Sequence, residues 1–269
     1  RDSVDASGRK RFILQSVPGS AVQFYGFNLH AHPFVDPRVR RAFSLAIDRR
    51  YLVDSVLGGL AVPAEHGLVA PGLSGYPYSA VTGHRFDPDA ARALLAEAGF
   101  PGGRGFPQVV LNASPGFGYI QVAEAVQDML QRHLGVPLIL SVLPIDQHYT
   151  SIERGRARFW REGWVADLPD AENFLSLLYG KNAQADTALP TYLNTSRYAD
   201  PRFDSLFAQA QRTVDDARRM QLFAEAEDQA MTDAPVTPLY HERTIRLLRP
   251  DVRDMPLNAM DLRDLGRVW

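Results

Sequence analysis

The stretch Phe159-Trp-Arg-Glu-Gly-Trp-Val-Ala-Asp-Leu-Pro-Asp-Ala-Glu-Asn-Phe-Leu-Ser-Leu-Leu-Tyr179 predicts a strand, a turn and a helix in succession. Residues 158–166 mix aromatic and β-branched side chains as strands do, and Gly163 leaves room for something lying alongside. The segment 167–170 is typical of a turn, and Asp170 can cap the helix that follows. Such an order places charged groups at the edge where α/β proteins bind ligands. The stretch therefore predicts an α/β fold with a ligand cleft at this point.

Patterns on both sides of that stretch predict further elements. Residues 109–111 and 136–143 form two predicted strands joined by a helix over 120–134, which is a βαβ unit with parallel strands. An Asp caps free amide groups, and Pro tolerates the first helical position. Asp-Pro pairs therefore predict helix starts, at Asp36, Asp87 and Asp200. The combination predicts a mixed β-sheet flanked by helices.

Both ends of the chain are predicted to form strands. Residues 11–16 and 21–30 alternate apolar and polar side chains, and Pro18-Gly19 predicts a turn between them. Residues 235–240 and 244–248 are predicted as two final strands. No internal repeat or low-complexity segment is present.

Two internal features depart from simple periodicity. Residues 60–86 are rich in Pro and Gly and predict a long irregular surface connection. Asp216 is predicted to cap a helix, and Glu227 interrupts the apolar stripe of that helix.

Composition limits the classes of protein to consider. The 269 residues are 45% hydrophobic, which suffices for one large core or two modest ones. The net charge of −2, from 29 basic and 31 acidic residues, argues against nucleic acid as the main partner. No apolar run approaches the roughly 20 residues that span a bilayer. Cysteine is absent, so this chain has no disulfide or thiolate metal site, and composition leaves the compartment open.

Three segments resemble one protein family. Trp164-x-Ala-Asp167, followed by Pro-Asp-x-x-Asn-Phe, is similar to the ligand-cleft segment of the extracytoplasmic solute-binding proteins of peptide and nickel ABC importers. Tyr25-Gly-Phe-Asn-Leu29 and residues 33–48 resemble the most recognisable signature of this oligopeptide- and dipeptide-binding family. Pro238-Leu-Tyr240 and residues 247–250 resemble its closing segment. The resemblance covers nearly the whole chain in the family's order.

The resemblance implies one lobe of a two-lobe periplasmic binding protein with type II-like architecture. Family members are longer, and their larger lobe has no counterpart here, so we expect the carboxyl-terminal half. Residues 1–22 are then a connecting strand from the larger lobe, 23–236 form the ligand-binding lobe, and 237–269 return toward the larger lobe. The amino terminus has no initiating Met and no signal-peptide pattern, which fits an excised piece.

By resemblance, Asp167 binds the α-ammonium group of a peptide through a charge-assisted hydrogen bond. The residue type alone also fits an ordinary turn. Arg161 matches an arginine that takes the ligand's carboxylate in some members, and it could otherwise be a solvated or paired side chain. In a regular strand the two share a face, with Cα atoms roughly 20 Å apart. Side chains that lean inward would leave the length of a tripeptide or tetrapeptide.

The other predicted site residues lie on the same strand and near the chain's return. An extended peptide can add to a strand edge through main-chain hydrogen bonds, while water-filled pockets accept varied side chains. The main-chain groups expected to take part belong to Gly163, Trp164, Val165 and Ala166. The Trp164 ring fits either a ligand wall or the core. The resemblance also implies that Tyr240 and His241 fall near the hinge, where they reach ligand or pack between lobes.

We expect a substrate-binding component of an ABC importer, and not an enzyme. It captures short peptides between two lobes and delivers them to the membrane subunits, as a periplasmic or lipid-anchored extracytoplasmic monomer without cofactor, metal or nucleic acid. The chain has no nucleophile elbow, phosphate loop or His-Glu-x-x-His helix. Two alternatives stay open. The cargo could be a nickel chelate, haem or an oligosaccharide, or Asp167 and Asp170 could be the paired carboxylates of a glycoside hydrolase.

Overall fold

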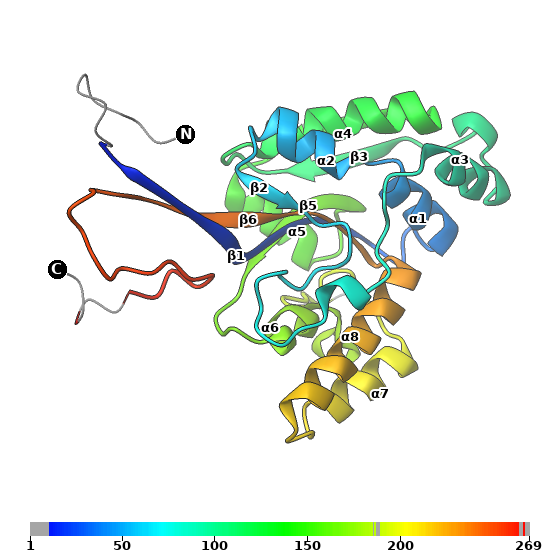
Figure 1. Ribbon diagram of the computed structural model, residues 1–269. Coiled ribbons are helices and arrows are strands. Elements are labelled where there is room, and N and C mark those ends of the chain that lie inside the picture. Colours follow the sequence, from blue (N-terminus) through cyan, green and yellow to red (C-terminus); the bar gives the residue numbers. More distant parts are fainter. Residues whose placement is uncertain (1–10, 185, 187–188, 264–265, 267–269) are drawn as a thin grey trace.

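Strands from both ends and the middle of the chain form one mixed sheet in the order β2-β6-β1-β5-β3-β4 (Figure 1). The structure is a computed structural model that describes residues 11–184, 186, 189–263 and 266. The strands are β1 (Ile13–Phe27), β2 (Ala61–Pro63), β3 (Val109–Ala113), β4 (Leu138–Val142), β5 (Phe159–Val165) and β6 (Val236–Leu248). Helices cover both faces of this sheet, which confirms the predicted α/β fold.

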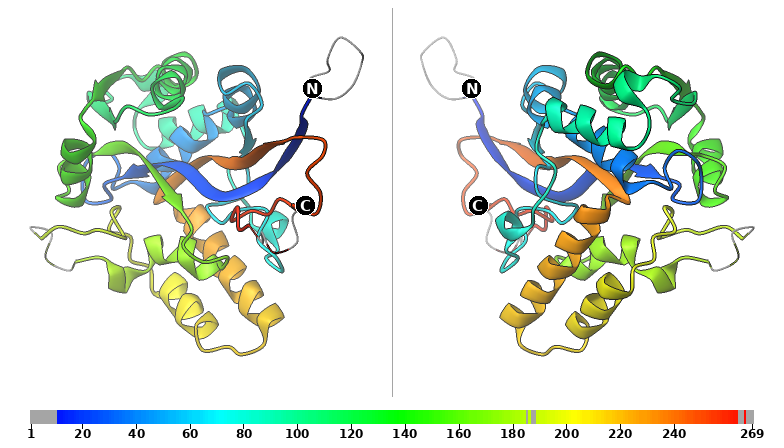
Figure 2. Two further views of the ribbon diagram at one scale, coloured as in Figure 1. Left: turned by 90° about the vertical axis from the view of Figure 1, so that its left-hand side faces the viewer. Right: turned by 90° about the vertical axis from the view of Figure 1, so that its right-hand side faces the viewer.

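Each face of the sheet has its own hydrophobic core and its own helices (Figure 2). The first face carries α1 (Pro37–Leu45), α2 (Arg49–Tyr51) with a π-helical turn (Leu52–Val56), α3 (Pro88–Glu97) and α4 (Tyr119–Leu134). The second face carries α6 (Ala171–Leu175), α7 (Pro201–Ala210) and α8 (Asp216–Asp233). Between them α5 (Ile145–Glu153) packs Ile152 against Trp160 of β5. The sheet is therefore buried on both faces along its middle.

Strand β5 is paired along its whole length on one side and along only part of it on the other. The unit β3-α4-β4 has parallel strands, as predicted, and β3 also runs parallel to β5. Contact between β3 and β5 is limited to the pairs Leu111–Phe159 and Asn112–Trp160. By contrast, β1 pairs with β5 along its whole length. Within the part of the chain that the structure describes, β5 beyond Trp160 therefore has a neighbouring strand on one side only.

Aspartates begin the helices as predicted. The side chains of Asp87 and Asp200 accept hydrogen bonds from the backbone N–H groups of Ala90 and Phe203, and Asp36 accepts one from Arg38. Helix α8 is capped by Asp215, one residue before the predicted Asp216. Because the cap needs an extended backbone with its oxygen near the N3 amide, neighbouring aspartates cannot be told apart by sequence.

The predicted breaks in the terminal strands are wrong. Residues 13–27 form one strand, and its register against β6 shifts between Pro18 and Val22 where the turn was expected. A bulge absorbs the Pro-Gly pair because the facing strand supplies partners on either side of it. Gly19 fits closely there, since a Cβ would lie 3.0 Å from the carbonyl oxygen of Glu242. Strand β6 is likewise continuous over residues 236–248.

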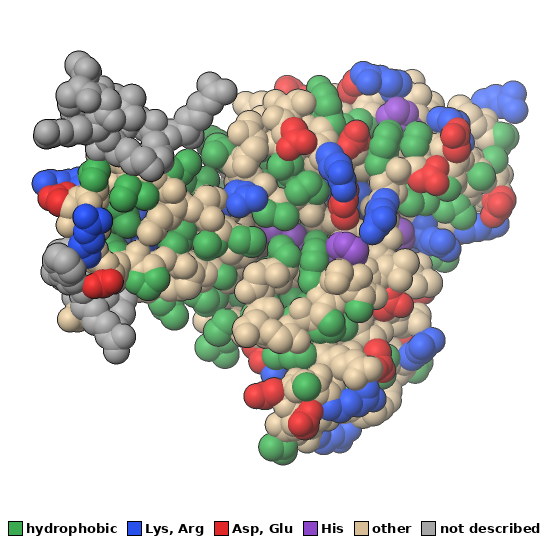
Figure 3. Space-filling model, in the orientation of Figure 1, with side chains coloured by type: hydrophobic (Ala, Val, Ile, Leu, Met, Phe, Trp, Pro, Cys, Tyr) green, Lys and Arg blue, Asp and Glu red, His purple; other side chains and the backbone are tan. Residues whose placement is uncertain are grey.

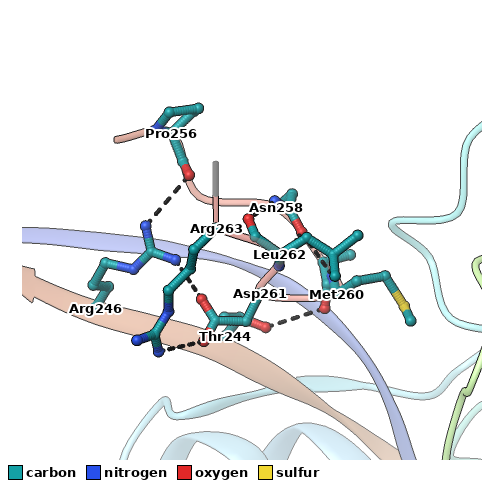
Figure 4. A network of polar contacts seen from close by, with 9 residues as sticks. Thr244, Arg246, Pro256, Asn258, Met260, Asp261, Leu262 and Arg263 are labelled. Atoms are coloured by element: carbon teal, nitrogen blue, oxygen red, sulfur yellow. Dashed lines mark hydrogen bonds and ion pairs between the residues drawn. The ribbon is translucent and has the colours of Figure 1, made fainter. Parts of the chain in front are cut away.

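The outer halves of β1 and β6 leave the sheet as a two-stranded ribbon (Figures 1 and 2). The segment after β6 folds back along it (Figure 4): Arg246 contacts Asp261, and the Thr244 hydroxyl donates to the Ala259 carbonyl. The predicted boundaries at 22/23 and 236/237 fall inside these two strands. Residues 1–10, 264–265 and 267–269 of the predicted end segments lie outside the described residues. The division into segments stays a prediction.

Glu227 explains the order of the long connection over residues 60–86. Its side chain is fully buried and accepts hydrogen bonds from the N–H groups of Leu68 and Val69 and from the Tyr76 hydroxyl. Burial raises the pKa of this carboxyl group. The interruption in the apolar stripe of α8 is thus an internal anchor for a loop that has little regular structure of its own.

Candidate ligand-binding site at the end of strand β5

The end of β5 lies where the ribbon leaves the sheet. Val165 pairs with Ala21, and the N–H of Ala166 donates to the carbonyl of Ser20 at 2.9 Å. Asp167 follows at this edge and is exposed. Among the described residues, none donates a hydrogen bond to its carboxylate. The predicted ligand residue is therefore available to solvent and lies on the side of the lobe from which the ribbon projects.

Asn173 of α6 fixes the turn that presents Asp167. Its Oδ1 accepts the indole N–H of Trp164 at 2.8 Å and the backbone N–H of Asp167 at 3.2 Å. The half-buried Trp164 ring packs on the core of the second face. The Trp164 N–H is therefore used within the protein, and the aromatic ring borders the site rather than filling it.

The open edge of β5 consists of main-chain groups of Gly163 and Val165. Paired antiparallel strands alternate between residues that bond each other and residues whose N–H and C=O point outward. Since Ala166 bonds to Ser20, the next residues with outward groups are Val165 and Gly163. No described residue forms a hydrogen bond with these outward groups. Val165 is also 68% exposed, so this edge can accept another strand.

Gly163 itself is required for packing within the sheet. A Cβ at this position would lie 2.4 Å from Oε1 of Gln23, which is 4% exposed. The absent side chain makes room for Gln23 and for the contact that Gln23 accepts from Arg161. The prediction that something lies alongside Gly163 is therefore met by a side chain of β1.

Arg161 is buried on the face of the sheet that carries α4. Its guanidinium carbon lies 3.5 Å from the centroid of the Tyr119 ring, and Nη2 donates to Gln23. The Gln23 amide in turn donates to Glu242 at 2.6 Å. Strand β5 ends at Val165, so the alternation of side chains between its two faces does not extend to Asp167. The strand geometry therefore does not place Asp167 and Arg161 on a common face. Gln23, Tyr119 and Glu242 come from other elements and were not foreseen.

The structure brings Tyr240 to this cluster and keeps His241 away from the surface. Tyr240 lines a pocket of about 290 Å³ together with Tyr119 and Glu242. His241 is fully buried, with Nε2 3.3 Å from the Tyr78 hydroxyl, and burial lowers its pKa to about 3. Neighbours in a strand point to opposite faces, so only one of the two could join the site.

A second pocket on the opposite face was also not foreseen. It has a volume of about 280 Å³ and is lined by Tyr149, Glu153, Glu162, Gly163, Trp164, Tyr192 and Thr195. Glu162 is buried there and accepts hydrogen bonds of 2.8 Å from the Trp160 indole and the Thr195 hydroxyl. Burial raises its pKa to about 7. The available signal was an acid between two tryptophans on one face of a predicted strand.

Comparison with known families decides the class of protein. A model described as "Bacterial extracellular solute-binding proteins, family 5 Middle" matches residues 2–186. The chain belongs to this family. The match covers β1, the βαβ unit and all of β5 with Asp167, which carry the open strand edge of the candidate site. The resemblance of the segment from Trp164 to Asp167 to solute-binding proteins is thus confirmed.

Relatives of this solute-binding family differ in what their names say they bind. The oligopeptide-binding protein OppA of Bacillus subtilis is 28% identical over 86% of this chain and 42% of its own length. A probable deoxycholate-binding periplasmic protein of Escherichia coli, YgiS, is 28% identical over 91% of this chain and 44% of its own length. The unliganded open form of the murein tripeptide-binding protein MppA superposes with a TM-score of 0.81 at 27% identity, over 95% of this chain and 48% of its own.

The family-5 chain described here spans about half the length of the curated relatives it matches. No helix within the described residues has the length and apolar character that crossing a bilayer requires. In the same residues, His, Asp and Glu side chains do not gather in any group of three or more that could hold a metal ion.

Proposed function

We propose that the chain is the ligand-binding lobe of an ABC importer's extracytoplasmic substrate-binding protein, and that its ligands are short peptides. The observation that carries this proposal is the open edge of β5, where no described residue pairs with the outward main-chain groups of Gly163 and Val165 and the exposed Asp167 lies just beyond. Main-chain groups of this kind bind an extended peptide whatever its sequence, and a carboxylate at the end recognises an ammonium group. Membership of the solute-binding family supports the same conclusion.

The direction of the peptide follows from the positions of these groups. Its first residue pairs with Val165, so that the α-ammonium group reaches Asp167, and the chain then runs antiparallel to β5 toward Gly163. At the other end Arg161 provides positive charge beside Tyr119 and Tyr240. We propose that the ligand's carboxylate approaches Arg161 through the pocket that these two tyrosines line.

A second lobe, packed against the ribbon, would complete the cleft. Apolar side chains lie over the projecting ribbon in Figure 3, and exposed ones on the ribbon and the segment beside it include Leu14, Leu247 and Leu262. Exposed apolar surface of this kind marks contact with a partner. In the intact protein, lobes that close around the peptide by hinge motion would then dock as a monomer on the importer's membrane subunits.

A non-peptide cargo is the second candidate function. The name of the YgiS relative supports it, since that protein is described as probably binding deoxycholate. A nickel chelate, haem or an oligosaccharide belongs to the same alternative. Mass spectrometry of the ligand that co-purifies with the complete protein separates the two classes, because peptides give fragment series that these cargoes do not.

No observation favours a hydrolase built on Asp167 and Asp170. The Asp170 carboxylate accepts the N–H of Glu172 at the start of α6 and is paired with Arg219 of α8. It therefore holds two elements together, and a carboxylate so engaged is not free to exchange a proton with a substrate.

Replacing Asp167 with Ala in the complete protein tests the proposal. Alanine tripeptide with a free amino group should raise the Tm of the wild type, whereas its N-acetylated form should not. The Asp167→Ala variant should bind the free peptide roughly 10 to 100-fold more weakly, because a hydrogen bond to a charged group is lost. Calorimetric titration measures the affinity.

Asp89→Ala serves as the matched control, because Asp89 is an exposed aspartate at the start of α3, far from the ribbon (Figure 1). It should bind peptide as the wild type does. Equal affinity of wild type and Asp167→Ala, or equal binding of the acetylated peptide, would remove Asp167 from the site.

A further inference from the structure

The pocket beside Gly163 has a marked chemical character. Of the described residues that line it, Glu153 and Glu162 are acidic and none is basic. Its remaining walls are largely aromatic, from Tyr149, Trp164 and Tyr192. Acidic groups among aromatic faces favour a cation, since the ring faces carry negative potential. This composition differs from that of a water-filled pocket that accepts any side chain.

Glu162 has one oxygen engaged and one oxygen available. Oε2 accepts the Trp160 indole N–H and the Thr195 hydroxyl, both at 2.8 Å. Oε1 accepts no hydrogen bond from a described residue, and it is not among the sealed interior atoms that lack a partner. The side chain is nevertheless only 8% exposed. Glu162 lines the pocket, and Oε1 is its available acceptor there.

The strand register says which ligand residue meets this pocket. Glu162 and Trp164 share one face of β5 because side chains alternate. A peptide whose first and third residues bond to Val165 and Gly163 has its second residue opposite Trp164. Directly opposed residues point to the same face, so the second side chain enters beside Glu162.

We propose that this pocket selects a basic side chain, Lys or Arg, at the second residue of the peptide. The inference rests on the proposed function, since it takes the peptide to lie along β5. An ammonium or guanidinium group there donates to Oε1 of Glu162, with Glu153 adding negative charge and the aromatic rings covering the aliphatic stem.

The charged groups around Glu162 agree with a pocket that binds a cation. Burial raises the pKa of Glu162 to about 7, with Glu153 raising it further and Arg161 lowering it. Tyr149 of α5 faces it as well. Without a ligand, this carboxyl group is therefore near its titration point at neutral pH. A bound cation stabilises the ionised form of Glu162. A cation therefore binds most tightly at a pH where Glu162 is charged.

The test compares three tripeptides on the complete protein by calorimetric titration: Ala-Lys-Ala, Ala-norleucine-Ala and Ala-Glu-Ala. Norleucine has the stem of lysine without the charge. We expect Ala-Lys-Ala to bind roughly tenfold or more tightly than the norleucine peptide, and Ala-Glu-Ala to bind most weakly. In Glu162→Gln, which keeps an oxygen for Trp160 and Thr195, the lysine preference should fall to the smaller part that Glu153 supplies.

A further variant and a change of pH separate the possible reasons for a negative result. Glu153→Gln, at the pocket's half-buried rim, should reduce the lysine preference severalfold even if Glu162→Gln fails to fold. In the wild type the preference should also shrink from pH 8 to pH 6 as Glu162 takes up a proton. Equal binding of the lysine and norleucine peptides overturns the inference and leaves peptide binding intact. Failure of all three tripeptides to bind overturns both proposals.

Discussion

Replacing Glu227 with Leu should lower the free energy of unfolding by about 3 to 5 kcal/mol, because the N–H groups of Leu68 and Val69 and the Tyr76 hydroxyl lose their common acceptor. Each of these donors is buried, and water cannot replace the carboxylate without opening the loop. Urea denaturation of the protein, followed by far-UV circular dichroism, measures the change. The midpoint should fall while the slope stays unchanged.

The pH dependence of Glu227 provides a second measurement on the same group. Its folded pKa is raised by burial, so the folded state holds the proton more tightly than the unfolded state. Its contribution to the free energy of unfolding is fully present below the pKa of the unfolded state, about 4.3. This contribution is lost as the pH rises through the pKa of the folded state. Glu227→Gln should remove this dependence while still offering an oxygen to the amides.

Glu225→Ala is the control for Glu227, because the Glu225 carboxylate lies two residues away on α8 in an exposed pair with Arg218. Its effect should stay within about 0.5 kcal/mol. A similar loss in both variants would mean that an acid anywhere on this helix matters, and the anchoring of the long loop would then need another cause.

The elements predicted correctly are those decided by neighbours in sequence. The strand, turn and helix around Asp167, the βαβ unit and the Asp-Pro helix starts depend on periodicity and on caps that act within a few residues. The continuity of β1 and β6 depends instead on pairing between the two ends of the chain. A Pro-Gly pair is a turn in isolation and a bulge when a partner strand lies opposite, so the local pattern could not decide.

The candidate site shows the same division. The strand that ends at Val165 and the turn that holds Asp167 lie where the sequence predicts them, since they depend on neighbouring residues. The partners of Arg161 did not follow, because Gln23 is 138 residues away in sequence and Tyr119 belongs to α4. Sequence can name a charged residue on a strand, but the residues that neutralise or orient it come from the packing of other elements.

Arg49→Met should destabilise the protein by about 3 to 5 kcal/mol, because the Arg49 guanidinium joins three separate parts of the chain. Nε donates to the Pro238 carbonyl of β6, and Nη1 donates to the carbonyls of Ser44 in the last turn of α1 and of His84 in the long connection. Only 3% of the residue is exposed, so these carbonyl groups would remain buried without a donor. Thermal and urea unfolding measure the loss.

Arg50→Met is the matched control in the adjacent position. Arg50 carries the same charge at the same helix start, but its side chain is exposed and pairs with Glu65 at the surface. Its replacement should cost less than about 1 kcal/mol. Arg49→Lys then separates charge from geometry: a lysine keeps the positive charge but lacks the planar fork that reaches several carbonyls at once, so we expect it to recover less than half of the loss. Full recovery by lysine would show that charge alone, rather than the fork, holds the helix layer to the sheet.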